Sequence, residues 1–412
     1  MTRHLLKLVW NRKRTNALLV LEILASFLVL FAVTALAVYA SSNARRPLGF
    51  SYERVWDVDV DMKLRGQPFT EEKAKLLELV HRAAAETDGV EAVAGAQVAP
   101  YSLGSSYGRQ RLAGSDGAAA REASFQRDEV TDGFADVMGM RLVAGRFFSK
   151  EDDAAPFRPV VVNARFARFV FGDADPIGKV LFTADAESQT PESRVVGVVE
   201  DFRKAGELSG PENFLFDREP VDGRVRGEGR PDRRPPPHIL VRVRAGTPPA
   251  FEERLAKTLQ AAAPDWSFEI EPLVDARASA LRLRLAPLLA IGLVAGFLLA
   301  MVALGLTGVV WQSVTQSTRE IGLRRAKGAT KSAILGQILG ELLVVTSFAL
   351  ALGLVLVLQL PLLHPFPSVS GGVYAASIAL SVLVMLLLTS LAGLYPAWLA
   401  TRVAPSRALR DE

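Results

Sequence analysis

Four long apolar runs dominate this sequence and limit what it can fold into. They cover about residues 17–40, 285–311, 333–363 and 373–399. Each run reaches the roughly 20 residues that a helix needs to cross a hydrocarbon core about 30 Å thick. Residues 41–283, between the first and second runs, have ordinary globular composition. The sequence therefore predicts a membrane α-helical protein with four transmembrane helices and a large α+β extracytoplasmic domain inserted between helices 1 and 2.

Lys and Arg residues next to these runs predict the orientation. The basic tail 1–16 and the loop 312–332, which holds Arg319, Arg324, Arg325, Lys327 and Lys331, should stay in the cytoplasm. The turn His364-Pro365-Phe366-Pro367 has no Lys or Arg and should be external. We therefore expect a multi-pass membrane protein with both termini cytoplasmic and the large domain extracytoplasmic.

The first run has an alternative interpretation as a cleaved signal peptide, because Val38 and Ala40 form an acceptable cleavage site. Its apolar stretch exceeds the usual core of a signal peptide, which is about 7–15 residues. The predicted order is then a tail (1–16), helix 1 (17–40), the domain (41–283), helix 2 with a stalk (284–311), the loop (312–332), helix 3 (333–363), helix 4 (373–396) and a cytoplasmic tail (397–412).

Two β-α-β patterns open and close the large domain, at about 54–99 and 238–271. In the first pattern, Trp56, Val58 and Val60 alternate with polar residues, and Thr70 is the expected N-cap of a helix. We expect the two units to pack together near the membrane, with residues 100–235 as a distal subdomain. Residues 217–237 are rich in Arg, Asp, Glu, Gly and Pro, and this composition is typical of a flexible loop.

Residue types needed for several kinds of catalysis are absent or wrongly spaced. The chain has no cysteine and only four scattered histidines, so we expect no disulfide, no thiolate nucleophile and no metal site. The segment ending in Lys331-Ser332 is not a P-loop, because Thr330 stands where the phosphate cradle needs glycine. Ser106 has the spacing of a hydrolase elbow but lacks the flanking strand and helix. We expect no catalytic or cofactor site and no nucleic-acid partner, because the basic residues flank membrane spans, where they can meet anionic lipid.

Small and acidic residues lie within the predicted spans. Gly292 with Gly296, and Gly336 with Gly340, have the G-x-x-x-G spacing that permits close helix approach. Contacts in a dimer and packing within the subunit both remain open for these pairs. Glu22 and Glu341 lie near cytoplasmic ends, where we expect them to reach headgroups or pair with a nearby Arg.

Several segments resemble one family. They are Gly145-Arg146-Phe147-Phe148, the acidic turn 151–153, the strand-like 159–162, the turn 172–179 with Asp173 and Asp175, the run 195–199, REIGLRRAKGAT at 319–330, and the C-terminal 395–410. Together they closely resemble MacB/FtsX-type ABC transporter permeases, and the resemblance spans essentially the whole chain. The periplasmic segments look structural, since Gly and Pro punctuate turns.

The resemblance implies that the cytoplasmic loop docks on a separate ABC ATPase. The implied coupling residues are Arg319, Glu320, Ile321, Gly322, Leu323, Arg324, Arg325, Gly328 and Ala329. The arginines can form forked pairs with carboxylates, and Ile321 and Leu323 can supply apolar anchors. The simpler alternative is that the basic residues only enforce topology, although Glu320, Gly322 and Gly328 do nothing for topology.

The resemblance also implies partners and a mechanism. Such permeases act as dimers, with a second copy or a paralogue and two ATPases, and ATP and Mg bind the ATPase and not this chain. They move the periplasmic domain by mechanotransmission to drive export, in some cases with a periplasmic adaptor and an outer-membrane channel. The alternative is an FtsX-like relay that activates a periplasmic cell-wall hydrolase. The substrate cannot be read from the sequence, and peptides, lipoproteins, lipids and drugs all remain open.

Overall fold

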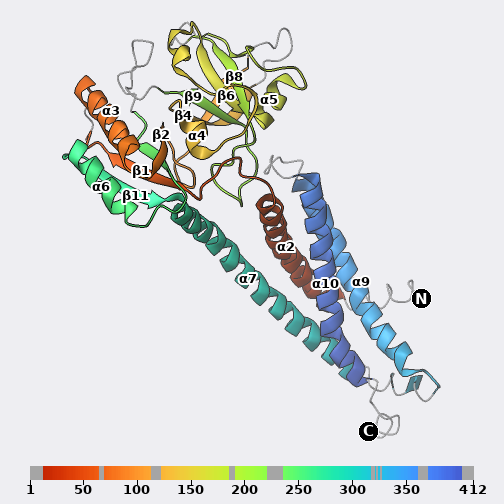
Figure 1. Ribbon diagram of the computed structural model, residues 1–412. Helices are drawn as coiled ribbons and strands as arrows, with labels where there is room; N and C mark the ends of the chain where they lie inside the picture. Colours follow the sequence, from red (N-terminus) through yellow and green to blue (C-terminus); the bar gives the residue numbers. More distant parts are fainter. Residues whose placement is uncertain are drawn as a thin grey trace. The chain divides into compact units, whose positions relative to one another are not determined.

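The protein, seen here as a computed structural model, forms two compact units (Figure 1). The structure describes residues 13–64, 69–112, 122–184, 191–219, 235–316, 321, 323–324, 327–360 and 370–400. One unit comprises Met1–Ser42 with Leu285–Glu412, and the other comprises Asn43–Arg284.

Long helices make up the first unit and confirm the predicted membrane architecture. They are α2 (Lys13–Ala44), α7 (Leu273–Gln316), α9 (Lys331–Gln359) and α10 (Gly371–Ala400). Among the described residues, these four helices are long and apolar enough to cross a membrane. Helix α7 is continuous through Pro287 and includes both the expected stalk and the expected span.

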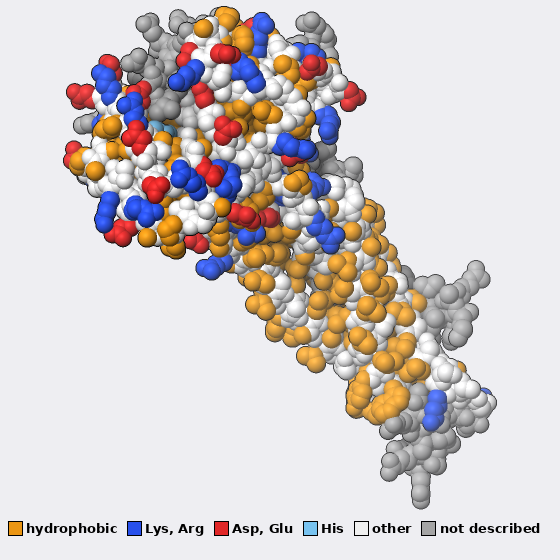
Figure 2. All heavy atoms as spheres, viewed as in Figure 1, with side chains coloured by type: hydrophobic (Ala, Val, Ile, Leu, Met, Phe, Trp, Pro, Cys, Tyr) orange, Lys and Arg blue, Asp and Glu red, His pale blue; other side chains and the backbone are white. Residues whose placement is uncertain are grey.

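The helices pack on one another through fully buried apolar side chains. Ile23 and Phe27 of α2, Leu306 of α7 and Ala349 of α9 are among those with no exposed surface. Hydroxyl groups add polar links, because Thr34 Oγ1 lies 2.6 Å from Ser381 Oγ and joins α2 to α10. Figure 2 shows hydrophobic side chains over the visible face of the helices, whereas charged side chains gather over the other unit.

The second unit is an α/β domain built on one mixed sheet. Its strands are β1 (Val55–Asp61), β2 (Val90–Ala96), β3 (Ser106–Arg111), β4 (Glu122–Val130), β5 (Leu142–Gly145), β6 (Arg158–Asn163), β7 (Val180–Phe182), β8 (Ser193–Val199), β9 (Phe214–Arg218), β10 (His238–Val243) and β11 (Ser267–Pro272). Its shorter helices are α3 (Glu71–Glu86), α4 (Phe134–Met138), η1 (Lys150–Ala154), α5 (Ala164–Phe171) and α6 (Phe251–Ala262). The strand order is β11-β1-β10-β2-β4-β9-β6-β8-β5, with β3 beside β4 and β7 beside β8.

The two β-α-β patterns form the β11-β1-β10-β2 part of the sheet. Their strands interleave, since β1 pairs antiparallel with both β10 and β11. Helices α3 and α6 pack side by side on one face, over a core that includes Val58, Ile239 and Val241. Thr70 caps α3 as predicted, because its side chain accepts a hydrogen bond from the Lys73 amide.

The rest of the sheet continues from this part through a narrow connection. Strands β2 and β4 share only the pair Ala96–Val130. A second hydrophobic core spans the connection, however, and contains Ala94 and Leu240 on one side and Phe202, Phe214 and Phe216 on the other. Residues of the expected proximal and distal parts therefore meet in this second core, and Asn43–Arg284 forms a single compact unit.

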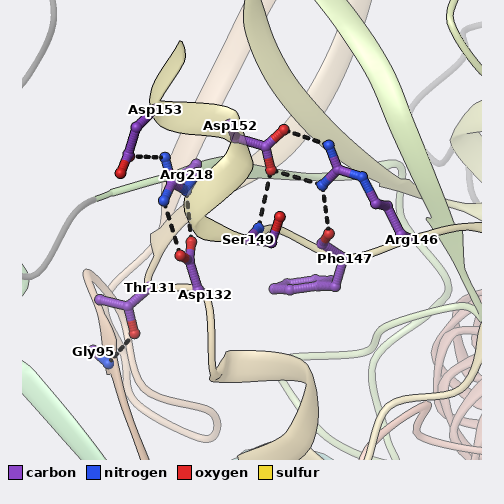
Figure 3. A network of polar contacts seen from close by, with 9 residues as sticks. All are labelled: Gly95, Thr131, Asp132, Arg146, Phe147, Ser149, Asp152, Asp153 and Arg218. Atoms are coloured by element: carbon purple, nitrogen blue, oxygen red, sulfur yellow. Dashed lines mark hydrogen bonds and ion pairs between the residues drawn. The ribbon is translucent and has the colours of Figure 1, made fainter. Parts of the chain in front are cut away.

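The acidic turn after Phe148 is part of a polar network (Figure 3). Arg146 Nη1 and Nη2 donate to the two carboxylate oxygens of Asp152 at 2.7 and 2.6 Å, and the Ser149 amide also donates to Asp152. Arg218 pairs with both Asp132 and Asp153. Because these carboxylates bind residues of the same fold, the network supports the structural interpretation of this segment.

Asp128 on β4 is a buried acid of the α/β unit. Its side chain is only 1% exposed and accepts a hydrogen bond from the Val98 amide at 3.1 Å. Burial raises the pKa of Asp128 to about 8, although nearby Lys204 opposes the shift. The folded protein therefore binds this proton more tightly than the unfolded chain, and stability should fall as the pH rises from about 4 to 8.

The variant Asp128→Asn keeps the shape of the neutral acid. We expect it to remove most of the fall in stability that the wild type shows as the pH rises. At pH 8 the variant should gain stability relative to wild type, on the order of a few kcal/mol at most, and at pH 5 much less. Thermal unfolding of the full chain in detergent at both pH values measures this difference. Asp88→Asn is the matched control, because the Asp88 side chain is 90% exposed. A variant whose unfolding depends on pH as the wild type does would contradict the prediction.

Candidate coupling site

The candidate coupling site is the segment between α7 and α9. Its described residues are Ile321, Leu323, Arg324 and 327–330. Four of the predicted coupling residues, Arg319, Glu320, Gly322 and Arg325, lie outside the described residues. The described ones show how the segment is fixed to the membrane helices.

Ile321, one of the two residues expected to supply an apolar anchor, is buried. Its side chain is only 7% exposed and packs against Ile334, with Val314 and Ile338 nearby. These partners belong to α7 and α9, so Ile321 ties the segment to the ends of both helices. Leu323 is 48% exposed and is the apolar side chain of the described segment that faces outward.

Arg324 is held along α9 by a short chain of polar contacts. Its Nη1 donates to Gln337 Oε1, and Gln337 Nε2 donates to Glu341 Oε1 at 3.1 Å. The expected pairing of Glu341 with a loop arginine is therefore bridged by Gln337. The Arg324 guanidinium and the Glu341 carboxylate support each other through this amide.

The end of the segment is shaped by a turn and a helix cap. The Ala329 amide donates to the Arg324 carbonyl at 3.0 Å, and Gly328 has a φ of +96°, which favours glycine. Thr330 then begins α9, because its side chain accepts from the Ala333 amide at 3.2 Å. Gly328 and Ala329 thus make a tight turn, and Thr330 sets where α9 starts.

Close helix approach occurs at Gly353 and Gly393, which lie outside the predicted pairs. A Cβ atom at Gly353 would overlap the Phe27 ring, and one at Gly393 would lie 2.6 Å from Leu342. A Cβ atom at Gly292, Gly296 or Gly336 would meet no described atom within 4 Å. The close approaches at Gly353 and Gly393 therefore lie within the described part of the subunit, whereas the described surroundings of Gly292, Gly296 and Gly336 are open.

Glu22 also has a neighbour that sequence patterns did not indicate. A Cβ atom at Gly305 of α7 would lie 2.9 Å from a carboxylate oxygen of Glu22 on α2. The missing side chain at Gly305 therefore makes room for this carboxylate between the two helices. The sequence did not indicate this contact, because Gly305 is not part of a predicted G-x-x-x-G pair.

Ser106 and His81, two residues of types used in catalysis, lie on β3 and α3. Ser106 begins strand β3 and is not placed in a strand–turn–helix elbow. Within the described ranges, no group of three or more His, Asp or Glu side chains could hold a metal ion. His81 is buried among apolar residues of α3, and burial lowers its pKa to about 4.

Two family models match this chain and between them cover both units. The model for the MacB-like periplasmic core domain matches residues 17–258, and the model for the FtsX-like permease C-terminal domain matches residues 292–405. The chain belongs to the MacB/FtsX-type ABC transporter permease family. It is thus a membrane protein whose large α/β domain is of the periplasmic MacB type.

Individual relatives of this MacB-like permease are longer proteins. The macrolide export ATP-binding/permease protein MacB of Chromobacterium violaceum is 30% identical over 292 residues, which is 68% of this chain and 42% of that protein. The probable syringafactin export ATP-binding/permease protein SyfD of Pseudomonas syringae is 28% identical over 218 residues, covering 52% of this chain and 32% of that protein. The crystal structure of the periplasmic region of MacB from Actinobacillus actinomycetemcomitans aligns with a TM-score of 0.36 and 15% identity over 56% of this chain and 94% of that one.

Proposed function

We propose that this MacB-like permease couples ATP hydrolysis by a separate cytoplasmic ABC ATPase to motion of its α/β domain. That motion would drive export of a substrate, in the manner of mechanotransmission. The observation that carries the proposal is the segment between α7 and α9, which presents Leu323 outward while Ile321 and Arg324 fix it to the membrane helices. A docking segment of this kind transmits force only if it is rigidly attached.

The described residues of this segment are attached to the membrane helices at three points. Ile321 is buried against the beginning of α9, Arg324 is bound to Gln337, and Thr330 caps the helix. A push on Leu323 would therefore move α9 and the end of α7 together. Helix α7 is one continuous helix from Leu273, in the core of the α/β unit, to Gln316. It supplies a direct mechanical connection along the chain.

Partners and location follow from the same proposal. The faces of α7 and α9 around Gly292, Gly296 and Gly336 are open within the described chain, and a second permease copy or a paralogue would pack there. ATP and Mg would bind the ATPase. A periplasmic adaptor and an outer-membrane channel would complete the exporter, with this chain in the inner membrane and both termini in the cytoplasm. The names of the relatives specify a macrolide and syringafactin, and we infer export as the shared activity.

The second candidate is an FtsX-like relay that activates a periplasmic cell-wall hydrolase. The match of residues 292–405 to the FtsX-like C-terminal model favours it. Both candidates need the ATPase, and they differ in the periplasmic partner. An adaptor or channel identifies an exporter, whereas a cell-wall hydrolase identifies a relay.

The test is a pull-down of the tagged full chain from its own membranes in gentle detergent, with identification of the co-purified proteins. We expect an ABC ATPase in about equal amount, since each permease would hold one ATPase. A second permease would report a heterodimer. Recovery of intact permease with no ATPase, even after ATP is trapped, would contradict the proposal.

A further inference from the structure

The loop Asp201–Ser209, which we call the junction loop, follows β8 and is rooted in the core of the α/β unit. Phe202 is 1% exposed, and its ring lies 4.8 Å from that of Phe214 and 5.1 Å from that of Phe216. Both of these partners belong to β9. The junction loop is therefore bound to the strands β8 and β9, between which it runs.

Arg203 binds the end of α2. Its side chain is 3% exposed, and Nη1 donates to the carbonyls of Asn43 and Arg46, each at 2.9 Å. Asn43 is in the last turn of α2, where carbonyl groups have no partner within the helix and a cation is favoured. The Arg203 amide also donates to Leu48 at 2.9 Å. Arg203 thus caps α2 from a loop 160 residues away in the sequence.

The same guanidinium shapes the junction loop itself. Arg203 Nη2 donates to the carbonyls of Gly206, Glu207 and Ser209. One buried side chain therefore binds five backbone carbonyls from two segments. Lysine could not replace it, because an ammonium is a compact donor, whereas the guanidinium is a planar fork.

Glu207 connects the junction loop to α7. Its carboxylate pairs with Arg277 Nε in the second turn of α7. The Arg277 guanidinium also lies over the Tyr52 ring, 4.9 Å from its centre. The start of α7 packs on the same core through Leu273, Ala276 and Ala280.

The two attachments differ in strength. The end of α2 is held by the buried Arg203 guanidinium through the carbonyls of Asn43 and Arg46. The Arg277 side chain is 32% exposed and contacts Glu207 and the Tyr52 ring. Water can replace a partner at an exposed pair but not at a buried one. The contact with α7 is therefore the one that is more accessible to water.

We propose that Arg203, Glu207 and Arg277 are positioning residues that hold the end of α2 and the first turns of α7 on the junction loop. Displacement of either helix then reaches β8 and β9 through Phe202. The transmitting role rests on the proposed function of ATPase-driven motion. The positioning role is independent of it and can be measured without the ATPase.

The experiment uses paired spin labels on the full chain in lipid nanodiscs. Because the chain has no cysteine, cysteines can be placed at Arg168 on α5 and Arg282 on α7, both exposed. Their distance distribution is measured for the permease alone, and then with the co-purified ATPase before and after nucleotide trapping. The variant is Glu207→Gln with Arg277→Gln, and the control is Arg54→Gln with Glu91→Gln, a more exposed ion pair of the same unit.

In the permease alone, we expect the junction variant to broaden the distance distribution and the control to leave it unchanged. With the ATPase, trapping should shift the wild-type distance, and the variant should lose about half or more of that shift while hydrolysis continues. Arg203→Lys, a second variant, should act in the same direction. Reversing the pair as Glu207→Arg with Arg277→Glu should restore part of the shift.

Two results separate failure of this inference from failure of the proposed function. An unchanged distribution and an unchanged shift in both junction variants would overturn the inference. A wild-type chain that binds a hydrolysing ATPase and shows no shift would instead overturn ATPase-driven motion, and the broadening in the permease alone would still decide the positioning role.

Discussion

Leu323→Glu should lower the association of the permease with its ABC ATPase by about 30-fold or more. An apolar side chain at the centre of an interface is worth about 2 kcal/mol or more when it is lost, and each 1.4 kcal/mol is a factor of ten in affinity. The permease itself should fold normally, because Leu323 is 48% exposed and changes at exposed positions usually stay within about 0.5 kcal/mol. Co-purification of the ATPase with the full-length variant measures the loss.

Lys327→Glu is the matched control for this change. Lys327 is exposed in the same segment, and its replacement alters the charge by two units whereas Leu323→Glu alters it by one. We expect Lys327→Glu to weaken association only a few-fold, as a charge at the rim of an interface does. Equal losses in the two variants would show that net charge, and not an apolar contact, carries the docking.

The membrane architecture could be read from the sequence because its signal is local. Each span is a run of apolar residues, and α7, α9 and α10 follow those runs closely. Strand β1 and the Thr70 cap were likewise predictable, because alternation and capping depend on residues only a few positions apart.

Features that depend on distant segments could not be read in this way. Ile321 and Leu323 are both apolar and two residues apart, and only the position of α9 decides that the first is buried and the second exposed. The sequence did not predict that Arg203 binds the end of α2, because its partners Asn43 and Arg46 lie about 160 residues earlier. The close approaches at Gly353 and Gly393 were missed because each is an isolated glycine facing another helix.

Gly49→Ala should destabilise the α/β unit by on the order of 3 kcal/mol or more. Gly49 has a φ of +82°, and a Cβ atom there would overlap the Asp201 carbonyl oxygen and lie 2.8 Å from its carbonyl carbon. Both atoms belong to the backbone of the junction loop, so they cannot turn aside as a side chain could. The positive φ adds about 1–2 kcal/mol for a residue with a Cβ atom, and overpacking adds about 1–3 kcal/mol.

Gly246→Ala separates these two contributions. Gly246 has the same φ of +82°, but a Cβ atom there would meet nothing described within 4 Å. Gly246→Ala should therefore lose only the stability that the positive φ costs, about 1–2 kcal/mol. Thermal unfolding of both full-length variants in detergent gives the difference, which measures the close approach of Gly49 to Asp201. If the two variants unfold at the same temperature, the segment after α2 does not lie against the junction loop as described, and the attachment of α2 through Arg203 fails with it.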